Sequence, residues 1–264
     1  MRFKLILEAI EGTLVIPVNY QYPLSSAIYR IIAKGDKEYA SFLHERGYGK
    51  GYKFFSFSDI KCPFTIQGDR LHLKQNTLEF QIAFQLPEAM QHFVQGLFAS
   101  EKICIADKKS KQSFKVKSIE TIPNLFSSKT LNEILSIEVK PFSPLVVGEK
   151  NERRHYDYLS PEDLRFLDSF IMNWREKIKA FYDLETANTA LLMIEPKFYL
   201  KGSRPRLITI KDNTEAETKI KGYINFKIAI TAERRFVDLL LNVGGGLYNA
   251  QGMGFLEVID EKKI

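Results

Sequence analysis

Tyr29, His44 and Lys50 stand 15 and then 6 positions apart in the N-terminal part of the chain. These residue types suit phosphodiester cleavage without a metal ion, because an RNA 2′-hydroxyl needs a base, the leaving 5′-oxygen an acid and the crowded phosphorane a cation. Histidine titrates near neutrality, and lysine is a compact charge for phosphate oxygens. Tyrosine, with a reference pKa of about 10, is a poor base unless a nearby cation lowers that value. The three are therefore the candidate catalytic residues, although each alone is more often a packing or surface residue.

A glycine-rich segment, Val243–Phe255, lies close to the C-terminus. Glycine permits positive φ and close backbone approach, and exposed N–H groups in such a loop can bind phosphate. The glycines follow an expected helix over 233–242 and lead into a strand, so they do not form the strand–glycine–helix fingerprint of dinucleotide sites. A tight structural connection is the alternative. The candidate RNA contacts in this segment are Gly244, Gly246, Gly252 and Gly254.

A second group of candidate RNA-binding residues is basic. The turn-rich segment 201–206 carries three cations and is either a phosphate-binding loop or solvated surface. Phosphate contacts position an RNA without reading its bases, so these residues are expected to give sequence-independent affinity. The basic candidates are Lys53, Lys201, Arg204, Arg206, Lys219 and Lys221.

Composition narrows the class of protein. The net charge of +6 and the pI of about 9.1 favour an anionic partner. The only two cysteines, Cys62 and Cys104, form no CxxC pair, which fits a reducing cytosol and argues against a zinc site. The acidic residues follow no metal-binding pattern, so no metal or cofactor is expected. A charged, alternating N-terminus and the absence of an 18-residue apolar run predict a cytoplasmic protein without a membrane partner.

Hydrophobic periodicity predicts the same order of elements in each half of the chain. Ser25 or Ser26 is the expected cap of the first helix, Asp36 that of the second, and Ser160 with Pro161 begins a long helix in the second half. In the first half, strands are expected over 2–10, 53–57, 64–67, 71–73, 77–83, 102–106 and 113–121, with helices over 24–32, 37–46 and 87–98. In the second half, strands are expected over 135–139, 189–195, 206–210 and 220–231, with helices over 160–182 and 233–242.

This order indicates an α+β fold of two tandem ferredoxin-like units. Residues 122–132 lack clear periodicity, so a boundary is expected there. The predicted domains are 1–126, which carries the catalytic helix hairpin, and 127–264, which carries the glycine-rich loop.

Three stretches together resemble one known family: Asn19–Tyr29, Phe42–Lys50 and Val243–Phe255. The phrases Leu-Ser-Ser-Ala-Ile-Tyr and Phe-Leu-His-Glu-Arg-Gly-Tyr look like the archaeal and bacterial CRISPR-associated endoribonucleases that process precursor CRISPR RNA, within the RAMP superfamily. The resemblance covers the whole chain. The glycine motif alone indicates only the superfamily, whereas the Tyr–His–Lys spacing is more specific.

The resemblance implies two tandem ferredoxin-like domains, each related to an RNA-recognition motif. It also implies cleavage of each CRISPR repeat without metal, by 2′-hydroxyl attack that leaves a 2′,3′-cyclic phosphate, or its opened form, and a 5′-hydroxyl. By this likeness Tyr29 is the general base, His44 the general acid and Lys50 the phosphate-stabilising cation. Many relatives carry Arg or Lys between the glycine clusters, whereas this chain has Leu247–Gln251. A phosphate grip in this loop would therefore come from backbone N–H groups.

Two other functions stay open at the level of sequence. One is a non-catalytic RNA-binding subunit of a CRISPR effector complex, and the other is a nucleic-acid-binding protein unrelated to CRISPR. The expected partner is CRISPR repeat RNA. The repeat sequence, its cut position and its secondary structure stay open, as do association with effector subunits and the choice between monomer and homodimer.

Overall fold

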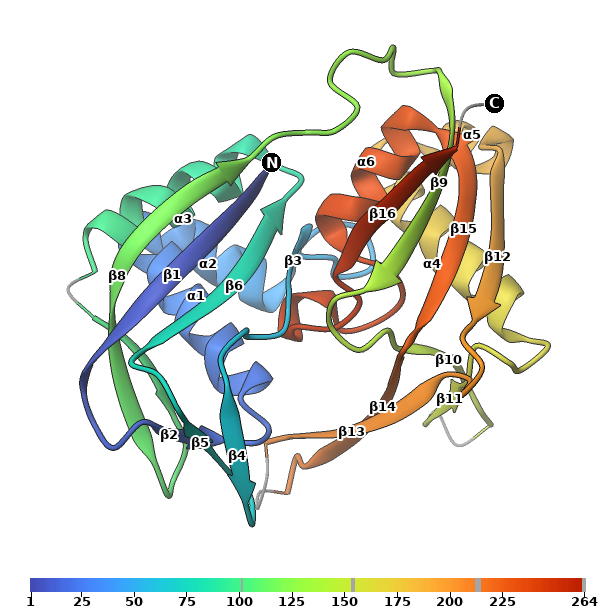
Figure 1. Cartoon of the computed structure of the whole chain (residues 1–264). Coiled ribbons are helices and arrows are strands. Elements are labelled where there is room, and N and C mark those ends of the chain that lie inside the picture. The colour runs from blue at the N-terminus through green and yellow to red at the C-terminus, as the bar shows by residue number, and fades with distance from the viewer. Residues whose placement is uncertain (101, 153–154, 212–214, 263–264) are drawn as a thin grey trace.

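Two antiparallel sheets, each covered on one face by helices, lie side by side in the computed structural model (Figure 1). The structure describes residues 1–264 except 101, 153–154, 212–214 and 263–264. The first sheet and its helices use the chain up to residue 122, and the second begins at residue 134. The predicted boundary between residues 126 and 127 falls in the segment that connects them.

The N-terminal sheet has five strands in the order β3-β6-β1-β8-β7. Its central strand β1 alternates along its length, and Phe3, Leu5 and Leu7 point into the core. A small three-stranded sheet, β2-β5-β4, extends from it. The strands of these two sheets are β1 (Arg2–Glu11), β2 (Val15–Pro17), β3 (Phe55–Phe57), β4 (Phe64–Gln67), β5 (Arg70–Leu73), β6 (Thr77–Phe84), β7 (Ile103–Ala106) and β8 (Lys111–Ile122).

Helices α1 (Gln21–Gly35), α2 (Lys37–Glu45) and α3 (Pro87–Phe98) cover one face of this sheet. Glycine lets α1 and α3 approach closely, because a Cβ on Gly96 would stand 1.8 Å from Ile31 O. Asp36 caps α2 as predicted, and its side chain accepts a hydrogen bond of 2.7 Å from Tyr39 N. This short turn fixes the α1–α2 hairpin, which carries Tyr29 and His44.

The C-terminal domain repeats the arrangement with a four-stranded sheet in the order β12-β15-β9-β16. Two hairpins, β10–β11 and β13–β14, stand apart from this sheet. The strands are β9 (Ile134–Pro141), β10 (Val147–Lys150), β11 (Tyr156–Leu159), β12 (Leu192–Phe198), β13 (Arg204–Ile210), β14 (Thr218–Ile224), β15 (Phe226–Glu233) and β16 (Leu256–Lys262). The helices are α4 (Phe166–Phe181), α5 (Leu184–Thr189), α6 (Arg234–Val243) and the 3₁₀ turn η1 (Asn249–Gln251). The protein is thus an α+β chain of two tandem ferredoxin-like domains, as the sequence predicts.

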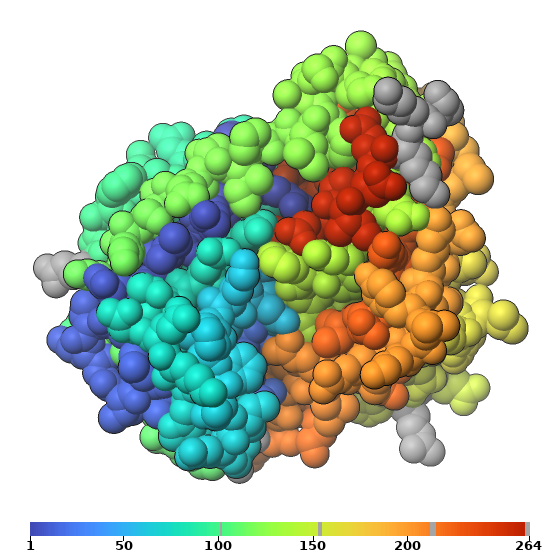
Figure 2. Space-filling model, viewed as in Figure 1, coloured from blue at the N-terminus to red at the C-terminus, as the bar shows by residue number. Residues whose placement is uncertain are grey.

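Side chains of the first domain bind carbonyl groups of the second. Arg2 Nη2 donates to Leu256 O at 2.9 Å, and its guanidinium carbon lies 4.7 Å from the centre of the Phe255 ring. Ser56 Oγ donates to Asn242 O at 3.0 Å. In Figure 2 the two halves meet along a line of direct contact. These bonds join the N-terminal sheet to α6 and β16 of the C-terminal domain.

The β13–β14 hairpin also reaches from the C-terminal domain to the N-terminal one (Figure 1). Arg206 on β13 pairs with Asp59, and the same carboxylate accepts 2.6 and 3.2 Å hydrogen bonds from Tyr20 Oη and Gln21 Nε2. Three residues further along β13, Thr209 N donates to Asn19 Oδ1 at 3.1 Å. Arg206 therefore ties the two domains together at the start of α1.

Several predicted element boundaries are wrong. α1 begins at Gln21 after Tyr20, without a side-chain cap, so neither Ser25 nor Ser26 is its N-cap. Both serines lie inside the helix, where Ser25 Oγ donates to Ala250 O at 2.7 Å and Ser26 Oγ to Tyr22 O at 3.0 Å. Pro23 is compatible with this start because the first turn needs no N–H donor there.

In the second half, α4 begins at Phe166 and not at Pro161. The carboxylate of Glu162 receives hydrogen bonds of 3.0 and 2.8 Å from Ser203 N and Oγ, which holds residues 161–165 in turns. The expected strand over 220–231 is two strands, because Asn225 has φ 64° and breaks the extended chain. Periodicity also failed to indicate the β10–β11 hairpin and α5.

We expect Arg206→Gln to lower the free energy of unfolding by about 1–3 kcal/mol, because it leaves the half-buried Asp59 without its cation. Arg204→Gln, on the same strand but exposed, is the matched control and should change it by less than about 0.5 kcal/mol. Urea unfolding measures both. Equal effects of the two substitutions would contradict the role of Arg206 at the domain junction.

Candidate active site

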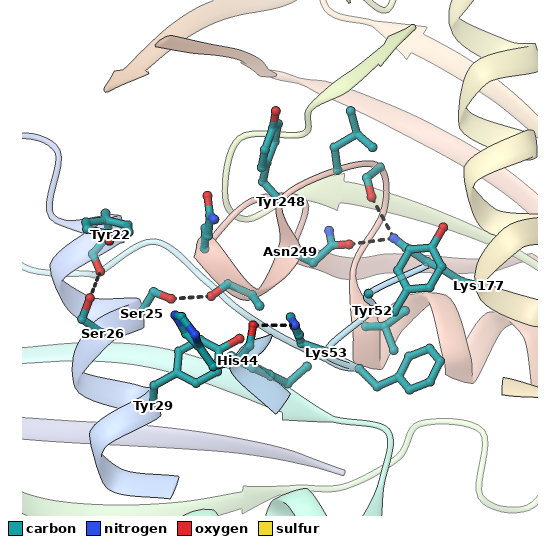
Figure 3. Close-up of a pocket in the computed structure, with 18 of the residues that line it drawn as sticks. Tyr22, Ser25, Ser26, Tyr29, His44, Tyr52, Lys53, Lys177, Tyr248 and Asn249 are labelled. Atoms are coloured by element: carbon teal, nitrogen blue, oxygen red, sulfur yellow. Dashed lines mark hydrogen bonds between the residues drawn. The ribbon is translucent and has the colours of Figure 1, made fainter. Parts of the chain in front are cut away.

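A cavity of about 520 Å³ lies between the two domains, and α1, the segment 51–55, α4 and the glycine-rich segment line it (Figure 3). Tyr29, His44 and Lys53 form one wall, and Tyr248, Asn249 and Lys177 lie across from them. Among the described residues that line it, Arg30, Lys53 and Lys177 are basic and none is Asp or Glu. The cavity therefore suits an anionic group.

Tyr29 and His44 stand edge to face, with ring centroids 5.5 Å apart and an interplanar angle of 84°. Tyr29 also packs edge-on against Phe55, at 5.7 Å between centroids, while the His44 side chain is exposed. Burial raises the pKa of the Tyr29 phenol well above its usual value. The hairpin thus brings both predicted residues together, with a protonated tyrosine beside an accessible imidazole.

The two neighbouring lysines lie in different places. Lys53 Nζ lines the cavity and donates to His44 O at 3.0 Å, and burial lowers its pKa. Lys50 lies outside the set of cavity-lining residues, 69% exposed, with its Nζ 3.0 Å from Glu176 Oε2. Lys50 occupies a tight turn between Gly49 and Gly51, whose φ angles of +53° and +95° suit glycine. The predicted trio is therefore only partly assembled.

In the glycine loop, residues 244–254, the glycines are buried, whereas residues 247–251 line the cavity. A Cβ on Gly246 would stand 2.1 Å from Val146 O, and one on Gly254 would stand 2.0 Å from Gly245 O. The amides of Gly244, Gly252 and Gly254 donate to the carbonyls of Leu240, Asn249 and Pro144 at 2.8, 3.0 and 2.8 Å. These three predicted phosphate donors are thus already bonded within the protein, which favours the structural interpretation of the loop.

Lys177 on α4 anchors the glycine loop by hydrogen bonds. Its buried Nζ donates to Gly244 O at 2.7 Å, Gly246 O at 2.8 Å and Asn249 Oδ1 at 2.7 Å (Figure 3). Sequence reasoning missed this residue. The signal was a lysine in the apolar stripe of a helix, next to Trp174 and Ile178, since a buried lysine needs oxygen partners.

Two family models match the chain over most of its length. The one described as CRISPR associated protein Cas6, C-terminal, matches residues 128–258, and the one described as CRISPR-associated protein Cas6, N-terminal, matches residues 15–120. The chain belongs to the Cas6 family. A relative named CRISPR-associated endoribonuclease Cas6 1, from Methanocaldococcus jannaschii, is 25% identical over 263 residues, which cover 99% of this chain and 94% of the relative.

Solved structures show the same fold along the whole Cas6-family chain. A Cas6-related protein of Pyrococcus furiosus has a TM-score of 0.78 at 20% identity, with 99% of each chain covered. A structure described as an RAMP protein binding different RNA substrates has a TM-score of 0.76 at 17% identity and covers 98% of this chain and 100% of its own. The predicted membership of a CRISPR-associated family is confirmed by the two family models, and these structures show that the fold is shared.

The basic candidates of the second domain lie outside the cavity lining of this Cas6-family chain. Arg206 pairs with Asp59, and Lys219 Nζ lies 3.8 Å from Glu217 Oε1. Lys221 Nζ stands 5.5 Å from the centre of the Tyr223 ring. Lys201 and Arg204 are exposed at the β12–β13 turn and on β13.

Two further features concern the described residues alone. No three of their His, Cys, Asp and Glu side chains are grouped so that they could hold a metal ion. None of the helices they form is long and apolar enough to cross a membrane.

Lys177→Met should lower the free energy of unfolding by about 2–5 kcal/mol, because it keeps the apolar stem of the side chain but removes the donor from the three oxygen atoms that bind Nζ. Lys179→Met, at an exposed position of the same helix, is the matched control. Urea unfolding of both variants measures the difference. A loss no greater than that of the control would contradict the anchoring role.

The same pair gives a pH dependence. Burial lowers the pKa of Lys177 to about 7, whereas a lysine in the unfolded chain titrates near pH 10.4. Between these values the unfolded chain holds a proton that the folded chain has released, so folding gains stability as pH rises. The free energy of unfolding of the wild type, measured relative to that of Lys177→Met, should rise from about pH 7 to about pH 10. It should stay constant below about pH 7.

Proposed function

We propose that this chain is an endoribonuclease that cleaves CRISPR repeat RNA to release guide RNAs, without a metal ion. Membership of the Cas6 family supports the activity, as does the curated relative named an endoribonuclease. The observation that carries the proposal is the Tyr29–His44 pair in a cationic cavity between two ferredoxin-like domains. The similar structure described as an RAMP protein binding different RNA substrates, with a TM-score of 0.76, supports RNA as the partner.

In the proposed reaction the ribose 2′-oxygen attacks the adjacent phosphorus. The P–O2′ bond forms, the P–O5′ bond breaks, and the products are a 2′,3′-cyclic phosphate and a 5′-hydroxyl. His44 gives a proton to the leaving 5′-oxygen, since its exposed ring faces the cavity from the end of α2. The cations supplied by this chain stabilise the charge that develops on the non-bridging oxygens.

Tyr29 orients the nucleophile in this scheme. Because burial raises its pKa, the tyrosinate that a strong general base requires is scarce at neutral pH. The phenol can still hold the 2′-hydroxyl by a hydrogen bond beside His44. The proton of that hydroxyl passes to a solvent water molecule in the open cavity as the P–O2′ bond forms. Its hydroxyl therefore contributes less to the rate than the imidazole does.

Lys50 and Lys53 have separate roles in the proposal. Lys53 holds the last turn of α2 through His44 O and adds positive charge to the cavity. Lys50 is paired with Glu176 at the exposed rim, and an exposed ion pair is worth at most about 1 kcal/mol. Lys50 can leave this carboxylate at little cost and turn to the phosphate, the role that its spacing from His44 predicts.

Cleavage of labelled repeat RNA should persist in EDTA, and a 2′-deoxy substitution at the cut site should abolish it by removing the nucleophile.

His44→Ala should slow single-turnover cleavage by ~10²–10⁴-fold with binding little changed. Tyr29→Phe, which keeps the packing, should cost about 10-fold, the value of one hydrogen bond. Binding of repeat RNA without cleavage by the wild type would contradict the proposal and favour a non-catalytic RNA-binding subunit.

Lys50→Ser should slow single-turnover cleavage by ~10²-fold or more, because it removes a cation from the transition state. Glu176→Gln breaks the same ion pair but releases Lys50, and the rate should be equal to or above that of the wild type. The two variants are compared at saturating RNA. Equal losses would mean that Lys50 serves only the ion pair, which would remove it from the catalytic group.

A further inference from the structure

A second cavity, of about 580 Å³, adjoins the catalytic cavity along α1. Both are lined by Tyr22, Ser26 and Arg30, which are spaced by four residues. Residues spaced in this way lie on one face of a helix, so the three form a stripe along which the two cavities meet. A polymer that crosses this stripe enters both cavities.

The second cavity has an apolar floor and walls from both domains. Pro17, Tyr22, Pro23 and Ala106 supply apolar surface from the N-terminal domain. Thr209, on β13, closes the other side, where its N–H donates to Asn19 Oδ1. The volume lies in the range of small-molecule sites, which combine an apolar lining with a few fixed polar groups.

Charge around this cavity is positive. Among the described residues that line it, five are basic and two are carboxylates, so basic groups outnumber acidic ones in this lining. Arg70 Nη2 lies 3.0 and 2.7 Å from carboxylate oxygens of Asp69 and Asp107, which fixes the β7–β8 turn at the rim. The basic residues are Arg30, Arg70, Lys108, Lys109 and Lys211. An occupant with an apolar ring and a negative group satisfies both the floor and the rim.

We propose that this second cavity binds one unpaired nucleotide of the RNA strand, next to the nucleotide whose phosphate is cut. The inference rests on the proposed function, because the catalytic cavity must hold the scissile phosphate. Tyr22 and Tyr29 are seven residues apart on α1, which is about 10 Å along the helix axis. Neighbouring nucleotides of one strand can span that distance. The Tyr22 ring then supports the base, and Arg30, whose Nη2 already binds Cys104 O at 3.1 Å, faces the backbone between the cavities.

The test is a cycle between a cavity-filling variant and an abasic scan. Ala106→Phe places a ring in the cavity at the end of an edge strand, and Ala99→Phe, at an exposed position after α3, is the control. The probe is repeat RNA with a 2′-deoxy nucleotide at the cut site and one abasic nucleotide at each position near it. Ala106→Phe should weaken binding of the intact probe by about 10-fold, within the range for one stacked base.

At one position adjacent to the cut, the abasic probe should bind the wild type about as weakly as Ala106→Phe binds the intact probe. That abasic probe should bind the two proteins equally. The proposal would be overturned if, at every position, the loss of affinity from Ala106→Phe added to the loss from the abasic nucleotide. It would also be overturned if Ala106→Phe bound the intact probe as tightly as the wild type does. Competition for this cavity by free adenosine or uridine monophosphate with a flat abasic scan would overturn it as well. Binding of the uncleavable probe does not need catalysis, so this cycle stays decisive even if the wild type fails to cut.

A charge variant gives an independent readout if Ala106→Phe folds poorly. Lys108→Ser should flatten the salt dependence of binding by about 0.7 in the log–log slope, the value for one phosphate on a single strand. Lys61→Ser, which is exposed outside both cavities, should leave the slope unchanged. Equal slopes for the two variants would count against a phosphate at this rim.

Discussion

The hydrogen bonds from Lys177 to the glycine loop hold one wall of the cavity that forms the candidate active site. An amine inside a protein is tolerated only where oxygen atoms accept its hydrogens, and a folded loop with inward carbonyls is stable only where donors meet them. The two requirements are met together by Gly244 O, Gly246 O and the side chain of Asn249. The loop therefore has a fixed shape although its glycines favour no regular structure.

The glycine loop in turn contacts α1, the helix that carries Tyr29. Ala250 O in the glycine loop accepts the hydrogen bond of Ser25 Oγ, and Gly252 packs so closely on Phe57 that a Cβ would stand 2.6 Å from its ring. Ser25 lies one turn before Tyr29 on α1. The C-terminal domain thus supplies one wall of the cavity and also sets the position of the N-terminal helix that carries the tyrosine, which explains why the site needs both domains.

Local patterns were enough to predict the architecture and the helix hairpin. Asp36 at a helix start and alternation in β1 act over a few residues, so they survive in the fold. The pairing of Arg206 with Asp59 and that of Lys50 with Glu176 join residues more than a hundred positions apart, and no local pattern encodes them. For Lys177 the local pattern indicates burial but does not name the oxygen atoms that bind it. The predicted start of α4 was wrong for the same reason, because Glu162 accepts hydrogen bonds from Ser203, which is 41 residues away.

The net charge can be read from the composition, whereas the positions of the charged side chains depend on the fold. A pI of about 9.1 favours an anionic partner but says nothing of where it binds. On the β13–β14 hairpin, Arg206 and Lys219 face carboxylates that offset their charge. Along α1, by contrast, the described lining of the catalytic cavity has basic residues without Asp or Glu, and the adjoining cavity has more cations than carboxylates. Because cavity walls of low dielectric strengthen such a field, a phosphate chain is attracted to the face of α1 that lines both cavities, and α1 is also the helix that carries the proposed chemistry.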